Sequence, residues 1–224
     1  NINHESENNR FKINFTAGYT AQFSDLPSID LTRNAITLSP NAPALYDASG
    51  NLNWENNTFA NPLAQHEGKI TGETYDFITN AFLSYELGSG FTAKSSFGYT
   101  DLRQKQLTLL PSTIFNPSLG RDSSSSTVFT NTMNRNSWII EPQLNWNRSL
   151  GKSRIEALVG STFQQQNSSQ LVSLAQSFAS NSLMENPASA ALYQIMNSDE
   201  TVYKYQAFFG RINLNWQEKY ILNL

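Results

Sequence analysis

Phe208-Phe209-Gly210-Arg211-Ile212-Asn213-Leu214-Asn215-Trp216 is the stretch that decides the fold. Every second position is apolar or glycine, and the positions between them end in Arg211, Asn213 and Asn215. A period of two residues predicts a β-strand with one apolar and one polar face. The alternation resumes after a polar turn at 217–219 and is still running at the last residue. Because a domain rarely stops within an apolar strand, we expect the sequence to be a piece of a longer polypeptide.

The same alternation recurs along the chain and predicts about seven antiparallel strands in a simple meander. They are expected at 8–23, 74–87, 91–100, 138–147, 155–164, 203–216 and 220–224. Tight turns are expected at 88–90, 150–152 and 217–219, and long polar loops at 24–73, 103–127 and 167–202. One or two helical turns are expected at 183–196. Pro142 lies inside an expected strand, where it removes a ladder hydrogen bond, so a β-bulge is expected there.

Composition excludes several classes of protein. Only 15% of the residues are charged and the net charge is -3, without a basic cluster, which argues against a nucleic-acid-binding surface. The absence of cysteine excludes disulfides and cysteine-based zinc sites. No run reaches the ~18 apolar residues of a membrane-spanning helix, so a membrane protein with this sequence would cross as strands.

Two arrangements fit the alternation alone, a soluble β-sandwich and a membrane barrel. Tight turns alternate with long loops, which places all long loops at one end of a meander, as in transmembrane barrels. Aromatic residues recur near the strand ends, as in interfacial girdles. The mid-strand charges fall on the polar parity and are expected to face the lumen: Lys12, Asp76, Glu86, Lys94, Glu141, Glu156 and Arg211. Together these patterns favour an all-β fold. The seven strands would be part of a large transmembrane antiparallel β-barrel of about 22 strands, with short periplasmic turns and long external loops.

The first long loop holds the candidate residues for contact with a substrate or a lid. It combines aromatic side chains with amides, which suits recognition of sugars or peptides. The candidates are Tyr46, Asn51, Asn53, Trp54 and Phe59, with Asn56 and Asn57 beside them. In the alternative interpretation, Tyr46 and Trp54 anchor the loop and the asparagines form turns.

The sequence offers little for metal binding or catalysis. Asp47, Ser49, Asn51 and Asn53 have the spacing of a calcium loop, but Leu52 stands where its glycine is required. His4 and His66 are isolated in polar sequence and are expected to be solvated. No nucleophile elbow, zinc-protease motif or phosphate loop is present, so we expect neither an enzyme nor a cofactor.

Two separated motifs resemble the SusC/RagA-type TonB-dependent outer-membrane transporters. The first is Asn41-Ala42-Pro43-Ala44-Leu45-Tyr46-Asp47 with the following 50–55 and 61–64, and the second is Ala207-Phe208-Phe209-Gly210-Arg211-Ile212-Asn213 with 220–224. The resemblance implies active uptake of glycans or oligopeptides across a bacterial outer membrane of the Bacteroidetes type. It also implies a SusD-like surface lipoprotein as partner and energy coupling to the TonB complex. Residues 1–224 would then be part of the barrel domain, without the plug domain and the remaining strands.

Two other functions remain open at this stage. A soluble or surface-attached β-sheet adhesin would use Tyr46 and Trp54 to bind glycans. A passive porin-like barrel would share the strands but lack energy coupling.

Overall fold

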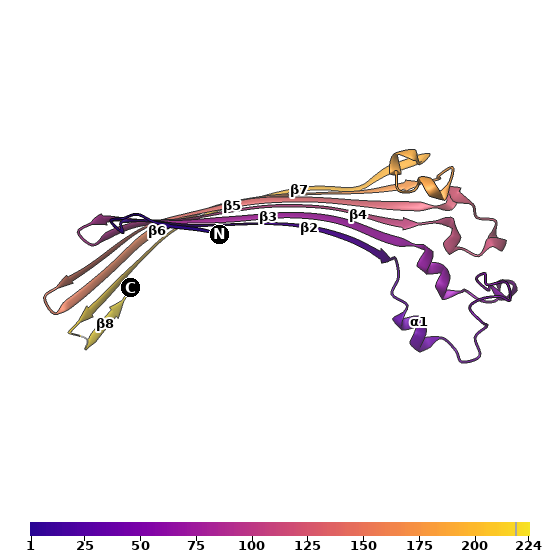
Figure 1. The fold of residues 1–224 in the computed structure, drawn as a ribbon, viewed down its shortest axis with the longest axis horizontal. Helices are drawn as coiled ribbons and strands as arrows, with labels where there is room; N and C mark the ends of the chain where they lie inside the picture. Colours follow the sequence, from indigo (N-terminus) through magenta and orange to yellow (C-terminus); the bar gives the residue numbers. More distant parts are fainter. Residues whose placement is uncertain (218) are drawn as a thin grey trace.

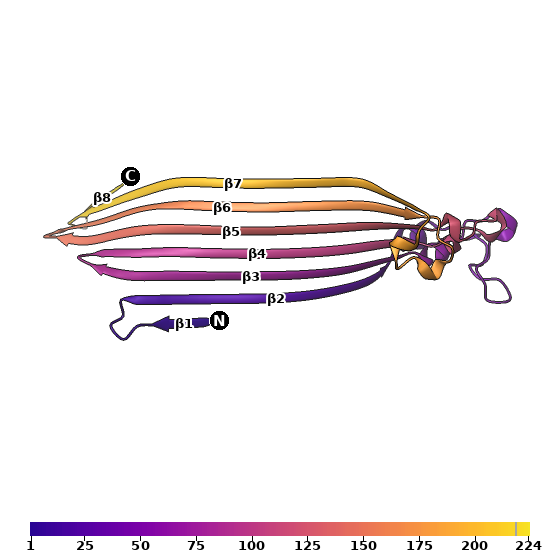
Figure 2. The ribbon, with the colours of Figure 1, turned by 90° about the horizontal axis from the view of Figure 1, so that it is seen from above.

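The computed structural model describes residues 1–217 and 219–224, and of Asn56 only the backbone. The chain forms one antiparallel sheet in which strands β1 to β8 follow each other in sequence order (Figure 2). The strands are β1 Ile2–Glu5, β2 Phe11–Pro27, β3 Lys69–Gly88, β4 Phe91–Leu110, β5 Thr127–Leu150, β6 Ser153–Gln176, β7 Leu192–Trp216 and β8 Tyr220–Asn223. The predicted meander is therefore confirmed, with one additional strand, β1, which pairs with β2.

The strands are longer and the loops shorter than predicted. β5 and β6 each contain 24 residues and β7 contains 25. The three long loops are 28–68, 111–126 and 177–191, which we call loops A, B and C. The expected bounds of β5 and β6 were wrong because polar residues on both faces of their outer segments, such as 164–170, remove the alternation that marks a half-buried strand. The start of β7 was missed because its apolar residues, such as Leu192 and Ile195, were assigned to helical turns.

Helical structure is confined to the loops. Loop A contains α1 Thr32–Thr37, η1 Glu55–Asn57 and η2 Pro62–Glu67, and loop B contains η3 Ser112–Ile114, η4 Pro117–Leu119 and η5 Ser123–Ser125. Loop C contains η6 Asn181–Leu183 and η7 Pro187–Ser189, so the helical turns expected at 183–196 end early and β7 begins at Leu192. Among the described residues, no helix is both long and apolar enough to cross a membrane.

Tight turns close the other end of the sheet, as predicted. At the turn between β3 and β4, the carbonyl of Gly90 accepts the backbone N–H of Asn147 at 2.9 Å. Gly90 has a φ of +86°, and a Cβ there would lie 2.2 Å from the carbonyl oxygen of Asn147. Glycine is therefore required both by the backbone conformation and by the close approach of β5. Glu218, in the turn predicted at 217–219, lies outside the described residues.

The expected bulge at Pro142 is wrong. Ile140 lies opposite Phe163 and Gln143 lies opposite Gly160, so the register between β5 and β6 is the same on both sides of the proline. The ladder omits Glu141 and Pro142 and then continues. A proline that lacks a donor is accommodated by this local gap in the hydrogen bonds, without an extra residue.

The sheet is a single layer with two different faces. One face, which we call the belt face, carries apolar windows of nine residues that are aromatic at one or both ends: 11–19, 77–85, 91–99, 138–146, 155–163 and 208–216. Beyond the belt, the next residues on this face of β4 to β7 are polar: Asp101, Asn136, Gln165 and Gln206. Nine residues match the 9–11 that a tilted transmembrane strand requires.

The position of the belt gives the tilt of the strands. The windows of β2 and β3 lie directly opposite each other in the ladder, and so do those of β4 and β5. From β3 to β4, from β5 to β6 and from β6 to β7, the window moves two residues toward the tight turns. Phe77, for example, lies opposite Asp101 and not opposite Tyr99. Six residues over five steps correspond to about 20 Å along the strands for about 24 Å across them, a tilt of about 40°. Transmembrane barrels have tilts of about 35–45°.

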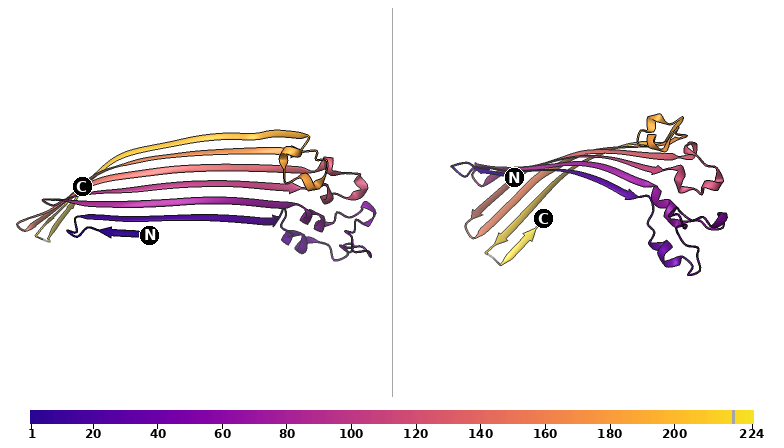
Figure 3. Two further views of the ribbon diagram at one scale, coloured as in Figure 1. Left: turned by 45° about the horizontal axis from the view of Figure 1, so that its top comes forward. Right: turned by 45° about the vertical axis from the view of Figure 1, so that its right-hand side comes forward.

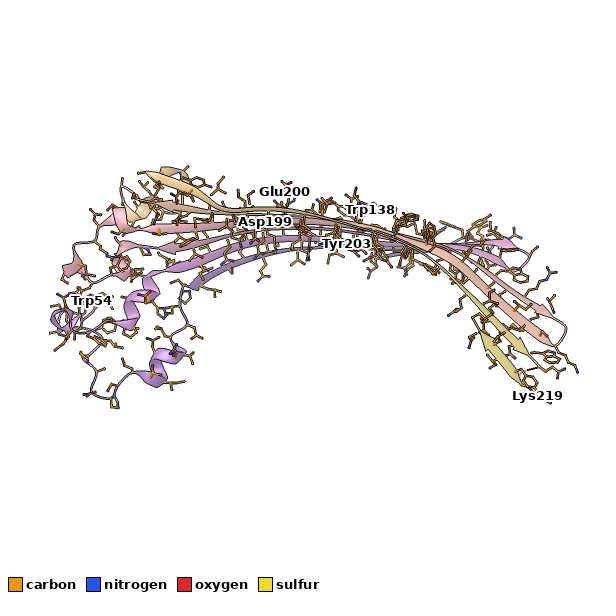
Figure 4. The ribbon with its side chains drawn as sticks, turned by 180° about the vertical axis from the view of Figure 1, so that it is seen from behind. Trp54, Trp138, Asp199, Glu200, Tyr203 and Lys219 are labelled. Carbon is orange, nitrogen blue, oxygen red and sulfur yellow. The ribbon has the colours of Figure 1, made fainter. Side chains whose placement is uncertain are left out.

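The far end of the sheet has a small apolar core of its own. Leu109, Val128, Ala175, Phe178 and Met184 form this cluster, where loop C folds onto the ends of β4 to β6. Figures 1 and 3 show loops A and C leaving the sheet on opposite sides, with loop A and α1 on the concave side. Figure 4 places Trp138 and Glu200, both on the belt face, on the convex side.

Candidate functional site

Loops A, B and C form a platform at the end of the sheet opposite the tight turns (Figure 2). Loops B and C are joined by a buried polar cluster of Ser112, Ser126 and Asn181. The Ser126 hydroxyl accepts the backbone N–H of Ser112 at 2.8 Å and donates to Asn181 Oδ1 at 2.6 Å. Asn181 Nδ2 in turn donates to Ser112 Oγ at 3.1 Å. Since buried polar groups left unpaired are costly, this cluster fixes the two loops to each other.

Loop A is attached to loop B by a second set of contacts. Asn57 Oδ1 accepts hydrogen bonds from Asn116 Nδ2 and from the Ser118 hydroxyl, and η2 lies against η3. The base of loop A is closed where the backbone N–H of Ser28 donates to the carbonyl of Gly68 at 2.9 Å. The attachment at Asn57 is exposed, whereas the cluster that joins loops B and C is buried. The contact between η2 and η3 is buried as well, at Ala64 and Ile114, so loop A is held by one buried and one exposed attachment.

Asn61 organises the interior of loop A. Its side chain is 3% exposed, and Nδ2 donates to the carbonyls of Leu45 at 2.6 Å and Asn53 at 3.0 Å. Its Oδ1 accepts the backbone N–H of Leu63 at 3.0 Å, which caps η2. One side chain thus connects three segments of the loop.

The predicted amides of loop A form internal hydrogen bonds. Asn51 donates its backbone N–H to Asp47 Oδ1 at 2.8 Å, and Asn53 Nδ2 donates to the carbonyl of Ala44 at 2.8 Å. Asp47 also accepts the N–H of Ser49, which closes a turn next to the bridge between Tyr46 and Leu52. The backbone hydrogen bond from Asn51 is the largest cause that lowers the pKa of Asp47. The carboxylate of Asp47 therefore acts as a turn acceptor in this structure.

The predicted aromatic residues of loop A differ in exposure. Tyr46 is 57% exposed, whereas Trp54 and Phe59 are half-buried. Figure 4 shows Trp54 at the loop end of the molecule. Tyr46 and Asn51 lie in one turn, and Asn53 bonds to its base, so the structure brings three of the five candidates together. The side chain of Asn56 lies outside the described residues.

The seven predicted charges all lie on the face opposite the belt. Three of them have polar partners: Lys12 pairs with Glu5 at 2.8 Å, Glu156 pairs with Arg154 at 2.8 Å, and Glu141 accepts the Ser96 and Thr162 hydroxyls at 3.0 and 3.1 Å. Lys94, Glu156 and Arg211 line one open pocket of about 250 Å³, and the other four charges are spread along the strands. Such a wall can bias the ions and solutes that pass it.

The strands are longer than predicted, and their outer segments add charged residues to the belt face that the sequence prediction did not assign to it. Glu73, Asp101, Arg103, Lys105, Glu200 and Lys204 lie on the belt face, all beyond the apolar windows. The apolar parity is free of charge within the belt, as expected for the middle of the strands, and it carries charges in the outer segments, which the sequence prediction places in loops or at a strand end.

Among the described residues, no three His, Cys, Asp or Glu side chains lie together in a metal-binding arrangement. His4 is exposed beside Phe11, and His66 is exposed at the end of η2.

The residues that hold the platform together were not identified from the sequence. A signal was present for some of them, because Asn61, Asn116 and Asn186 each precede a proline and each caps a 3₁₀ turn. Asparagine before a proline that can begin a helical turn is a capping pattern. No local pattern marks Ser112, Ser126 and Asn181, which meet only in the folded protein.

A tilted single-layer sheet with an aromatic-edged apolar belt, tight turns at one end and long loops at the other defines a class of protein. It is part of the wall of an outer-membrane β-barrel, in which the tight turns are periplasmic and the loops are external.

Comparisons with known proteins specify the type of barrel. The chain is 24% identical over 201 residues to TonB-dependent receptor P26 of Formosa agariphila, covering 85% of this chain and 20% of that receptor. It matches the RagAB peptide importer in the open-open state with a TM-score of 0.71 and in the closed-closed state with 0.70, each at 15% identity. These matches cover 96% and 97% of this chain and 25% and 26% of the importer chain. No protein-family model matches the chain.

These findings confirm the resemblance that the two sequence motifs indicated. The chain has the fold of a SusC/RagA-like TonB-dependent transporter barrel of the outer membrane. It spans about a fifth of the length of the curated receptor and about a quarter of the importer chain.

Proposed function

We propose that the chain is a wall segment, with external loops, of a transporter that imports large nutrients across the outer membrane. In this proposal the plug domain and the remaining strands belong to other parts of the complete protein, and the TonB complex supplies the energy. The similarity to a TonB-dependent receptor over most of the chain is the observation that carries this proposal. The barrel fold shared with a peptide importer supports it.

The height of the platform supports a function in capture outside the membrane. On β5, residues 127–137 lie beyond the belt, which at a tilt of about 40° raises the loops about 28 Å above the outer edge of the belt. A pore for small ions does not need such an extension. A raised rim suits contact with large solutes or with a protein that covers the opening, which we propose to be a SusD-like lipoprotein.

The substrates that we propose are oligopeptides or glycans, and Tyr46 is the residue of loop A placed best to contact them. Its ring is exposed, whereas Asn51 and Asn53 form internal hydrogen bonds that hold the turn. Loop A lies on the concave side of the sheet, the side of the seven charges, which would face the lumen (Figure 1). Trp54 and Phe59 would support this turn from partly buried positions.

Uptake by cells that carry the complete transporter tests the proposal. Deletion of its gene should abolish uptake of labelled oligopeptides or oligosaccharides, and a protonophore should abolish uptake by the complemented strain. Uptake that survives the protonophore would instead indicate a passive pore, and unchanged uptake after deletion would contradict the proposal altogether. Glycan binding by the purified protein without detergent, as a compact soluble monomer, would favour an adhesin.

The role of Tyr46 is tested separately. Tyr46→Ala should weaken substrate binding about threefold to tenfold, the range expected when one aromatic contact is removed, while Tyr46→Phe should retain most of the affinity. Equal substrate binding by the wild-type protein and by Tyr46→Ala would show that Tyr46 does not contact the substrate.

A further inference from the structure

An open cleft of about 570 Å³ lies on the belt face where the apolar belt ends at β2 to β4. Its lining joins four aromatic side chains, Tyr19, Tyr75, Phe77 and Tyr99, to the charged pair Asp101 and Arg103. The cleft forms here because the belt moves two residues toward the tight turns between β3 and β4. Arg103 is thereby placed opposite Tyr75, at the level of the aromatic row.

The charged pair presents a guanidinium outward. Arg103 Nε donates to Asp101 Oδ1 at 2.8 Å, and the Arg103 side chain is 69% exposed whereas that of Asp101 is 24% exposed. Asp101 thus holds one edge of the guanidinium, and Nη1 has no partner within the described part of the chain. Planar guanidinium groups are well suited to phosphate, and a carboxylate beside them can accept sugar hydroxyls.

The aromatic rings provide apolar faces beside the charge. Phe77 and Tyr99 lie with their ring centroids 6.4 Å apart, and Tyr19 and Tyr99 are 66% and 41% exposed. Aromatic residues at this depth face lipid headgroups at the membrane interface. A ligand there must combine phosphate and sugar chemistry with acyl chains that continue along the belt.

We propose that this cleft binds the headgroup of a phosphorylated glycolipid of the outer leaflet. Arg103 binds the phosphate, the tyrosine rings contact the sugar, and the acyl chains lie along the belt toward Phe97 and Leu83. The inference rests on the proposed function only insofar as the belt face must contact lipid, and it is independent of the transported substrate.

The test uses the complete transporter in phosphatidylcholine vesicles that contain bisphosphorylated lipid A, and measures the lipid A retained after extraction. Arg103→Gln should reduce retention about tenfold, the effect expected when a direct hydrogen bond between a guanidinium and a phosphate is lost. The matched control is Lys204→Gln, which removes a cation on the same face of β7 outside the cleft and should leave retention unchanged. Dephosphorylated lipid A should show no difference between wild-type protein and Arg103→Gln.

Other outcomes overturn the inference. Equal loss in both variants would indicate unspecific attraction of a charged lipid, and displacement by inorganic phosphate alone would indicate a simple anion site. Arg103→Lys, which keeps the charge and removes the planar fork, should give an intermediate retention and show that loss does not come from misfolding. An error in the proposed function would give a different result. If the belt face did not contact lipid, the protein would not stay in the vesicles when they are washed.

Discussion

A single arginine placed in the belt tests the membrane assignment directly. Val159 is 58% exposed and lies at the centre of the window 155–163 of β6. At a tilt of about 40°, four residues on each side place it about 10 Å from either edge of the belt. An arginine at the midplane of the lipid-facing side costs about 2–4 kcal/mol, so Val159→Arg should lower the folding equilibrium constant roughly 30- to 900-fold.

Ser169→Arg is the matched control, because Ser169 is on the same face of the same strand and ten residues beyond Val159. It lies about 33 Å further along the strand, outside the hydrocarbon, and opposite Glu200. Its cost should be within about 1 kcal/mol. The assay is guanidinium unfolding of the complete transporter in lipid vesicles, followed by tryptophan fluorescence. Equal destabilisation by the two substitutions would refute a belt that contacts hydrocarbon.

Three further predictions concern the loops. Hydrogen exchange measured by mass spectrometry tests the predictions for Asn61 and Asp47, and proteolysis tests the prediction for Asn181. Asn61→Ala removes three hydrogen bonds and should destabilise loop A locally by about 1–3 kcal/mol. Asn61→Asp keeps the cap to Leu63 but turns a buried carboxylate oxygen toward the carbonyls of Leu45 and Asn53, so it should cost at least as much. Asn181→Ala removes the side-chain hydrogen bonds between loops B and C and leaves the backbone bond from the Phe178 N–H to the Ser123 carbonyl, so proteolysis in either loop should be faster while the sheet stays intact. Because the folded state lowers the pKa of Asp47, its turn is stabilised above the unfolded pKa of about 3.9 and loses this stabilisation as the pH falls through the lower folded value. The protection factors at 47–53, which compare the observed exchange with intrinsic exchange at the same pH, should therefore fall below about pH 4 in the wild-type protein and not in Asp47→Asn.

The sequence predicted the parts of the fold that local alternation encodes. Windows such as 91–99 and 138–146 have one polar and one apolar face. The pattern alone therefore predicts the strands, which residues share a face, and the tight turns. Beyond Tyr99 and Trp138 both faces are wet, and the pattern no longer separates a strand from a loop. Only the ladder with neighbouring strands shows that β4 continues to Leu110 and that β5 begins at Thr127.

The candidate site was predictable to a lesser degree. Turn-forming asparagines have local signals, and Asn51 and Asn53 indeed hold a turn. The partners of Asn181 are 55 and 69 residues away along the chain, so their meeting depends on the register of two strand pairs. The position of Arg103 beside Tyr75 depends in the same way on the shift of the belt against the ladder. Such contacts are properties of the assembled sheet and have no counterpart in a window of sequence.

The low charge of the chain has a structural reason in the outer strand segments. There, side chains on neighbouring strands lie about 5 Å apart with water on both faces, and like charges at that distance repel. Neutral amides instead bond within and between strands: Gln165 to Asn167 at 3.0 Å, Asn167 to Asn136 at 2.9 Å, and Gln170 to Asn131 at 3.0 Å. These pairs occupy both faces, so the outer wall is held by its side chains as well as by its ladder. Between the belt and the apolar cluster at the loop end, the strands have water on both faces and no core, so such pairs stabilise them, which agrees with a sequence that is polar but only 15% charged.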